Sequence, residues 1–253
     1  MEKTVLFFLV TVASVTASAQ KLPNVQQESL RAPTNVKIDG KANEWGDFKT
    51  YNKNVDVFYA LANDNDKLYL AIKATDKNII YKIINGGISF AVHASGKKDD
   101  DGEIVITYPK FDNKNFPSIN LDNKPIAKKG LPVSVTRMDS FSNAMSKNLN
   151  DRAKMIQVST QKDSTSMLSI YNEFGINASQ LIDNQLSYIY ELAVPLKYLH
   201  ISNSASTIAY NIKLNGMYAT LPKNVVITAM VANDTALNAL SPTDFWGEYS
   251  LAK

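Results

Sequence analysis

The chain contains no cysteine in its 253 residues. Disulfide bonds, iron–sulfur clusters, zinc–thiolate sites and thiol nucleophiles are therefore excluded. We also expect no lipid anchor of the kind that holds many exported bacterial proteins to a membrane, because that attachment requires a cysteine. Stability has to come from the hydrophobic core, which about 234 residues can supply in one β domain.

Histidine is also scarce, with two residues in the chain, and no Gly-x-Ser-x-Gly element is present. A hydroxyl or thiol nucleophile with a histidine base therefore has little support. Glu44, Glu191 and Glu248 are carboxylates of the kind that a glycosidase pair uses. Motif positions or strand faces explain all three, so we predict that the chain is not an enzyme.

An excess of one charge sign is missing as well. Lysine and arginine number 27 against 24 aspartates and glutamates, for a net charge of +3, and these charges are scattered along the chain. Nucleic-acid binding calls for a concentrated basic face. The sequence therefore predicts no nucleic-acid partner.

The longest apolar run, Val5 to Val15, is short. It has about eleven residues, whereas a membrane-spanning helix needs roughly 20. Lys3 precedes the run, and the small residues Ala17-Ser18-Ala19 follow it, as at a signal-peptidase site. We expect residues 1–19 to be a cleaved signal peptide of a secreted or periplasmic protein without membrane insertion.

Beyond the signal, the sequence predicts one folded unit. Residues 20–33 are polar and contain two prolines, which indicates an extended lead-in. Residues 34–253 show no repeat of fixed period and no second linker. We therefore predict a single domain from residue 34 to the end of the chain.

Alternation of apolar and polar residues is the main pattern in this domain. It starts with a short strand at Val36 to Ile38, followed by an Asp-Gly turn. Val55, Val57, Tyr59 and Leu61 then lie on one side of a strand, and the polar break at 63–66 makes a hairpin with the next. Further strands are expected at the residues 68–72, 88–92, 104–108, 155–159, 167–171, 186–194, 208–217, 225–231 and 245–251.

Helical patterns are few. Residues 76–84 have the spacing of a short amphipathic helix, which Gly86-Gly87 would end, and residues 195–199 suit a helical turn. Residues 109–130 and 139–154 are polar, which favours surface excursions. The fold class that this predicts is all-β, an antiparallel β-sandwich with one or two short helices.

Four motifs in order carry a family resemblance. Residues 36–46, Val-Lys-Ile-Asp-Gly-Lys-Ala-Asn-Glu-Trp-Gly, resemble the opening of family 9 carbohydrate-binding modules and the wider DOMON-like group. Residues 65–72 with Asp76 resemble the second strand of the family's hairpin. Glu-Leu-Ala-Val-Pro-Leu at 191–196 resembles a strand exit, and Pro242 with residues 245–251 resembles the closing strand. The likeness extends to exported proteins of Bacteroidetes-type bacteria that carry this domain alone.

The resemblance implies a secreted β-sandwich that binds carbohydrate without catalysis and assists polysaccharide handling. Sugar rings stack on aromatic faces, so Trp45 and Trp246 are the first candidates, and both also suit buried plugs of the fold. Tyr108 and Phe111, with Phe116 nearby, are further candidates on the polar excursion. They would equally pin that excursion to the sandwich.

Three alternatives remain open. The first is a structural or interaction domain of the cell envelope that docks through residues 110–128. The second is a haem-binding DOMON domain, in which ligands would come from His93, His200, Met217 and Met230. The third is calcium at the acidic residues 99–103, which lack EF-hand spacing. No other cofactor is expected, and the sequence predicts no oligomeric state.

Overall fold

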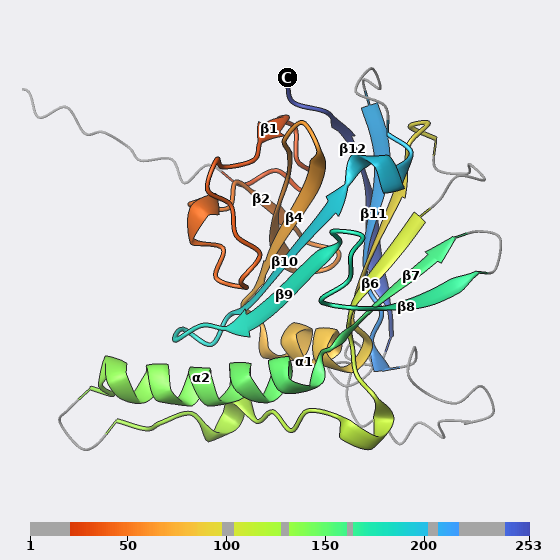
Figure 1. Cartoon of the computed structure of the whole chain (residues 1–253). Coiled ribbons are helices and arrows are strands. Elements are labelled where there is room, and N and C mark those ends of the chain that lie inside the picture. Colours follow the sequence, from red (N-terminus) through yellow and green to blue (C-terminus); the bar gives the residue numbers. More distant parts are fainter. Residues whose placement is uncertain (1–20, 98–103, 128–131, 161–163, 202–206, 218–240) are drawn as a thin grey trace, which may run out of the picture.

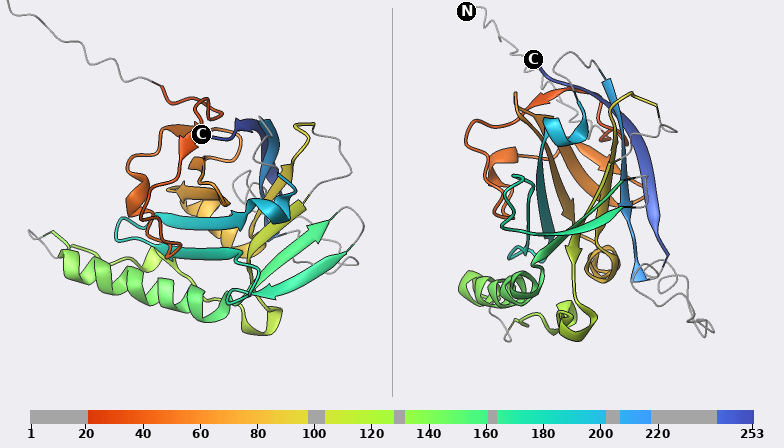
Figure 2. Two further views of the ribbon diagram at one scale, coloured as in Figure 1. Left: turned by 45° about the horizontal axis from the view of Figure 1, so that its top comes forward. Right: turned by 45° about the vertical axis from the view of Figure 1, so that its right-hand side comes forward.

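In the computed structural model, two β-sheets pack face to face, and the helices lie at one end of the pair (Figures 1 and 2). The structure describes residues 21–97, 104–127, 132–160, 164–201, 207–217 and 241–253. The all-β sandwich predicted from the sequence is confirmed. The expected signal peptide, the acidic residues 99–103 and the strand 225–231 lie outside the described residues.

The first sheet has six strands in the order β1-β3-β4-β10-β9, and β2 pairs with β3 beside this path. All its described pairings are antiparallel except that between β1 and β3. Its strands are β1 (Leu30–Arg31), β2 (Thr50–Asn52), β3 (Val57–Asn63), β4 (Lys67–Ala74), β9 (Asn177–Ile182) and β10 (Tyr188–Pro195).

The second sheet also has six strands, in the order β12-β11-β5-β6-β7-β8, and each described pairing is antiparallel. Its strands are β5 (Ile88–His93), β6 (Ile104–Lys110), β7 (Met155–Thr160), β8 (Thr165–Ser169), β11 (Thr207–Leu214) and β12 (Thr243–Ser250). The strands of this sheet were predictable, because all six overlap expected ones.

The core lies between the sheets and follows the predicted alternation. Val55, Val57, Tyr59 and Leu61 are fully buried, as their shared side of the strand predicts. Tyr188 and Tyr190 also point inward, which settles the face of β10 that the sequence left open. Inside the core the Tyr59 and Tyr210 hydroxyls are hydrogen-bonded at 2.9 Å, so these buried polar groups are paired.

Helix α1 (Lys77–Gly86) confirms the amphipathic pattern predicted at 76–84. The Asp76 carboxylate accepts hydrogen bonds from the backbone N–H groups of Asn78 and Ile79, which caps the first turn. Gly87 follows the last turn with φ of +78°, a conformation that glycine adopts without strain. Ile80, Ile83 and Ile84 face the core.

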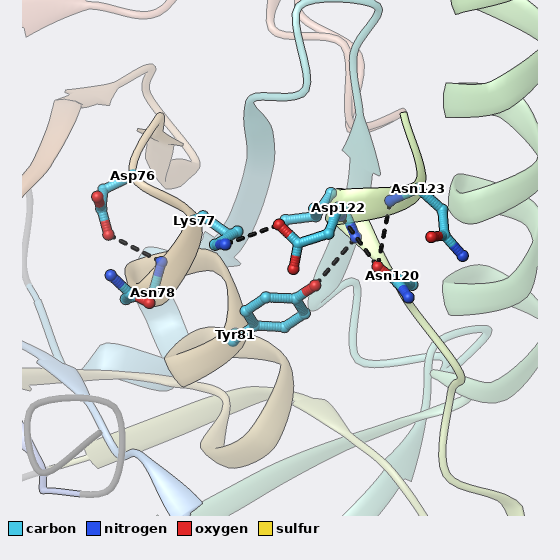
Figure 3. A network of polar contacts seen from close by, with 8 residues as sticks. Asp76, Lys77, Asn78, Tyr81, Asn120, Asp122 and Asn123 are labelled. Atoms are coloured by element: carbon cyan, nitrogen blue, oxygen red, sulfur yellow. Dashed lines mark hydrogen bonds and ion pairs between the residues drawn. The ribbon is translucent and has the colours of Figure 1, made fainter. Parts of the chain in front are cut away.

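The polar excursion is attached to α1 rather than free. Leu121 is buried, and its backbone N–H donates to the Tyr81 hydroxyl at 2.9 Å. Lys77 pairs with Asp122 at 2.7 Å in the same network (Figure 3). Two short 3₁₀ turns, η2 (Asn113–Asn115) and η3 (Leu121–Asn123), lie in this segment. The excursion therefore packs on the sandwich through a buried anchor.

Two expectations about local structure are wrong. No helix was expected at the polar residues 139–154, but helix α2 (Val135–Arg152) covers most of them. Its buried residues are Ser142, Met145 and Leu149, a stripe with helical spacing that is too narrow to stand out among asparagines and serines. The strand expected at Val36 to Ile38 is absent, and the next two residues, Asp39 and Gly40, donate to the Glu191 side chain instead of to a strand.

The lead-in at residues 20–33 contributes to the fold from Lys21 onward. β1 lies within it and pairs with β3, and Gln26 is buried. The Gln26 side chain donates to Leu61 O at 2.7 Å and accepts from Leu61 N–H at 2.9 Å. This segment therefore behaves as an edge of the first sheet. No helix among the described residues is long and apolar enough to span a membrane.

Candidate functional site

A pocket of about 640 Å³ opens on the outer side of the first sheet. Its floor comes from Phe58, Lys73 and Ile189, which are directly opposite one another on β3, β4 and β10. Their chain neighbours Tyr59, Ile72 and Tyr190 face the core. Since side chains alternate along a strand, the floor residues point away from the core into the pocket.

Two segments form the pocket walls. One is the stretch 41–48, which contains the 3₁₀ turn η1 (Asn43–Trp45) and lies outside the first sheet (Figure 2). The other is the turn between β9 and β10. The lining residues of both walls are Lys41, Ala42, Asn43, Gly46, Asp47, Phe48, Asp183, Asn184 and Gln185, with Thr75 from the end of β4.

The second wall is rigidly held. The Asp183 carboxylate accepts backbone hydrogen bonds from Gln185 at 2.9 Å and Ser187 at 2.8 Å, which closes the turn. Asp183 also pairs with Lys73 on the floor at 3.9 Å. Asn184 donates to Asp139 of α2 at 2.8 Å. Hydrogen bonds and an ion pair thus hold the Asp183 carboxylate and the Asn184 amide of this wall.

The first wall is held by one buried carboxylate. Glu191 is fully buried on the outward side of β10 and accepts from the backbone N–H of Asp39 at 3.1 Å and of Gly40 at 2.7 Å. Its other oxygen accepts from the Trp45 indole at 2.9 Å. Burial raises the pKa of Glu191, and the hydrogen bonds from Trp45 and Gly40 oppose this shift. The carboxylate therefore locks the 39–45 segment over the sheet.

Trp45 is a supporting residue of this site. Its ring is half-buried and packs near Tyr69 at 6.3 Å between ring centroids. It does not line the pocket, although its neighbours Asn43 and Gly46 do. The sequence motif thus lies in the segment that forms one wall of the pocket, and the aromatic lining residues are Phe48 and Phe58, which no motif singled out.

The other candidates lie elsewhere. Trp246 is half-buried on the outer side of the second sheet, with its ring 5.2 Å from that of His93. Tyr108 is 2% exposed and lies in the core near Tyr190. Phe111 packs against Phe116 on the excursion at 5.5 Å. The four predicted residues are therefore not brought together at one site.

Of the candidate carboxylates, Glu44 lies in η1 next to the Trp45 that donates to Glu191, whereas Glu248 and the described haem-ligand candidates lie elsewhere. Glu191 lies outside the first sheet and Glu248 outside the second. His93 ends β5, whereas the exposed His200 follows the 3₁₀ turn η4 (Leu196–Leu199) after β10. Met217 ends the described part of the β11 segment, and Met230 lies outside the described residues. Among the described residues no three His, Asp or Glu side chains gather in a metal-binding group.

A second concavity of about 610 Å³ lies near the β3–β4 turn and the β10 exit. Phe174, Glu173 and Lys197 are among its lining residues. It offers one aromatic lining residue, against two in the pocket on the outer side of the first sheet.

No protein-family model matches this chain, and a search of curated proteins finds no match. The likeness to family 9 carbohydrate-binding modules therefore stays a hypothesis. Function has to be argued from the pocket itself.

Proposed function

We propose that this chain is an exported, non-catalytic carbohydrate-binding β-sandwich, and that the sugar binds in the pocket on the outer side of the first sheet. The observation that carries the proposal is the composition of that pocket. Phe48 and Phe58 supply aromatic faces, and Asn43, Asp47 and the 183–185 turn supply polar groups.

This combination suits a sugar ring for a physical reason. The C–H faces of a pyranose pack on aromatic rings, while its hydroxyls need both donors and acceptors. Lys41 and Lys73 balance Asp47 and Asp183 among the lining charges. The absence of a net charge in the lining favours neutral sugars over acidic ones. The pocket volume also lies in the range usual for small-molecule sites.

A glycan array followed by calorimetry tests the proposal. Plant, host and bacterial glycans are screened with protein that circular dichroism shows to be folded. Binding to a neutral glycan is expected. Absence of binding across all three classes would refute carbohydrate binding.

Two matched variants then test the location. Phe48→Leu keeps apolar volume and removes the aromatic face, so the affinity for the glycan is expected to fall about tenfold or more. Phe174→Leu makes the same change in the second concavity and should leave affinity unchanged. The reverse result would place the sugar in the second concavity.

A further inference from the structure

The edge strand β9 of the first sheet is covered by other residues, whereas the edge strand β8 of the second sheet is not covered by described residues. The outer edge of β9 is covered by α2. There the Ser146 hydroxyl donates to Ile182 O at 3.0 Å and accepts from Ile182 N–H at 2.8 Å. These bonds satisfy the backbone groups that an edge strand leaves open.

β8 has no such cover in the described part of the chain. It is the last strand of the second sheet, and it lies at the margin of the sandwich (Figure 1). Its sequence, Thr-Ser-Met-Leu-Ser, contains no charge and no proline. Edge strands usually carry charged residues or proline, because these residues prevent pairing with the strand of another chain.

The ladder with β7 shows which backbone groups of β8 are open. The Ile170 N–H donates to Lys154 O at 3.0 Å, and the Thr160 N–H donates to Ser164 O at 3.1 Å. Antiparallel pairs alternate between hydrogen-bonded and open. The N–H and C=O groups of Thr165 and Met167 and the N–H of Ser169 therefore point away from β7. The Ser169 C=O is not open, because it accepts from the Asn172 backbone N–H at 3.0 Å and from the Asn172 side-chain amide at 2.8 Å.

This open edge is nearly self-complementary. A two-fold axis at Met167 brings Met167 opposite its copy and Thr165 opposite Ser169, so that the N–H groups of Met167 and Ser169 meet the C=O groups of Met167 and Thr165 in the other copy. No like charges face each other in this pairing. Met167 is 46% exposed, and the exposed Tyr171 and Phe174 follow in the adjoining loop, which adds apolar surface near the strand.

We propose that β8 pairs antiparallel with β8 of a second copy of this chain, so that the second sheets of two molecules become one continuous sheet. The interface is isologous and closed, because the same strand serves on both sides. This inference stands independently of carbohydrate binding.

Charge variants at Met167 test the pairing by analytical ultracentrifugation over a wide range of protein concentration. Wild type is expected to show a monomer–dimer equilibrium. Met167→Lys and Met167→Glu each place like charges opposite each other at the axis. Each variant alone should raise the dimer dissociation constant about tenfold or more. An equimolar mixture of the two should dimerise again, because lysine then faces glutamate.

Met167→Leu is the matched control and should dimerise like wild type, since it stays apolar and uncharged. The exposure of this side chain means that all three variants should keep the wild-type melting temperature. A wild-type protein that stays monomeric at every concentration would overturn the proposal, as would an edge that takes an extended peptide of another protein instead. Charged variants that dimerise as tightly as wild type would also overturn it.

Discussion

The Glu191 carboxylate accepts a 2.7 Å hydrogen bond from the backbone N–H of Gly40, 151 positions earlier in the chain. This bond joins the centre of the first sheet to the segment that forms one wall of the pocket. The same carboxylate receives the Trp45 indole. One buried charge thus organises a wall that has no strand ladder of its own.

Replacing Glu191 with glutamine should destabilise the fold. The amide keeps one acceptor oxygen but directs an NH₂ group at donors that need acceptors. A loss of about 1–3 kcal/mol in the free energy of unfolding is expected, measured by urea denaturation. Glu248→Gln, at an exposed site on β12, is the control and should leave stability unchanged. Equal stability of both variants would contradict the organising role of Glu191.

The raised pKa of Glu191 predicts a pH dependence with a definite sign. In the folded protein this group takes up its proton at higher pH than in the unfolded chain, because burial disfavours the charge. Between the unfolded and folded pKa values the folded state binds more protons. The contribution of Glu191 to stability therefore falls as pH rises through that window, which starts near 4.5, the ordinary pKa of a glutamate.

The measurement is the difference in unfolding free energy between wild type and Glu191→Gln as a function of pH. Other titrating groups cancel in this difference. The wild-type advantage should shrink as pH rises above about 4.5 and then level off. An advantage that grows with pH in this window would mean that hydrogen bonding outweighs burial.

Replacing Gly40 or Gly46 with alanine distinguishes two ways in which a side chain can lower stability, by steric clash and by backbone strain. Both have positive φ, +83° and +60°. A Cβ at Gly40 would lie 2.8 Å from the Gln180 backbone carbon, whereas one at Gly46 would meet nothing within 4 Å. Gly46→Ala should cost about 1 kcal/mol and Gly40→Ala about 2 kcal/mol or more. Thermal denaturation of the two variants compares them directly.

Ser146→Ala removes the cap on the edge of β9. The Ile182 N–H and C=O lose their partner, and the expected loss is about 1–2 kcal/mol. Hydrogen exchange should quicken at the Ile182 amide in particular. Ser140→Ala on the exposed side of α2 is the control. Unchanged exchange at Ile182 would show that water replaces the hydroxyl without cost.

The parts of the fold that the sequence predicts are those with local signals. Strands such as β3 alternate clearly, and α1 has both an apolar stripe and an aspartate cap. β9 was not predicted, because Asn177 to Ile182 mixes polar and apolar residues without alternation and its order depends on pairing with β10. The same holds for α2, whose formation depends on packing against β9 rather than on residues of high helix propensity.

The pocket could not be predicted from the sequence either, because it also depends on contacts between residues far apart in the chain. Phe48, Phe58 and Asp183 have no common motif. The register of β3, β4 and β10 places Phe58 in the floor, and the tertiary positions of the 41–48 segment and of the β9–β10 turn bring Phe48 and Asp183 to it. The Ile-Asp-Gly turn was recognised, but its link to Glu191 was not, since nothing local connects them. The motif residues turned out to be the framework of the wall, and less conspicuous neighbours line the cavity.

The dependence of the first sheet on β10 has a consequence for the order of assembly. β10 lies between β4 and β9, and it carries both Ile189 of the pocket floor and Glu191 of the wall. Contacts this distant in sequence form late, because a long loop must close first. A chain still being made has no pocket until residues near 190 are available. The pocket is therefore complete only once β10 has joined the first sheet.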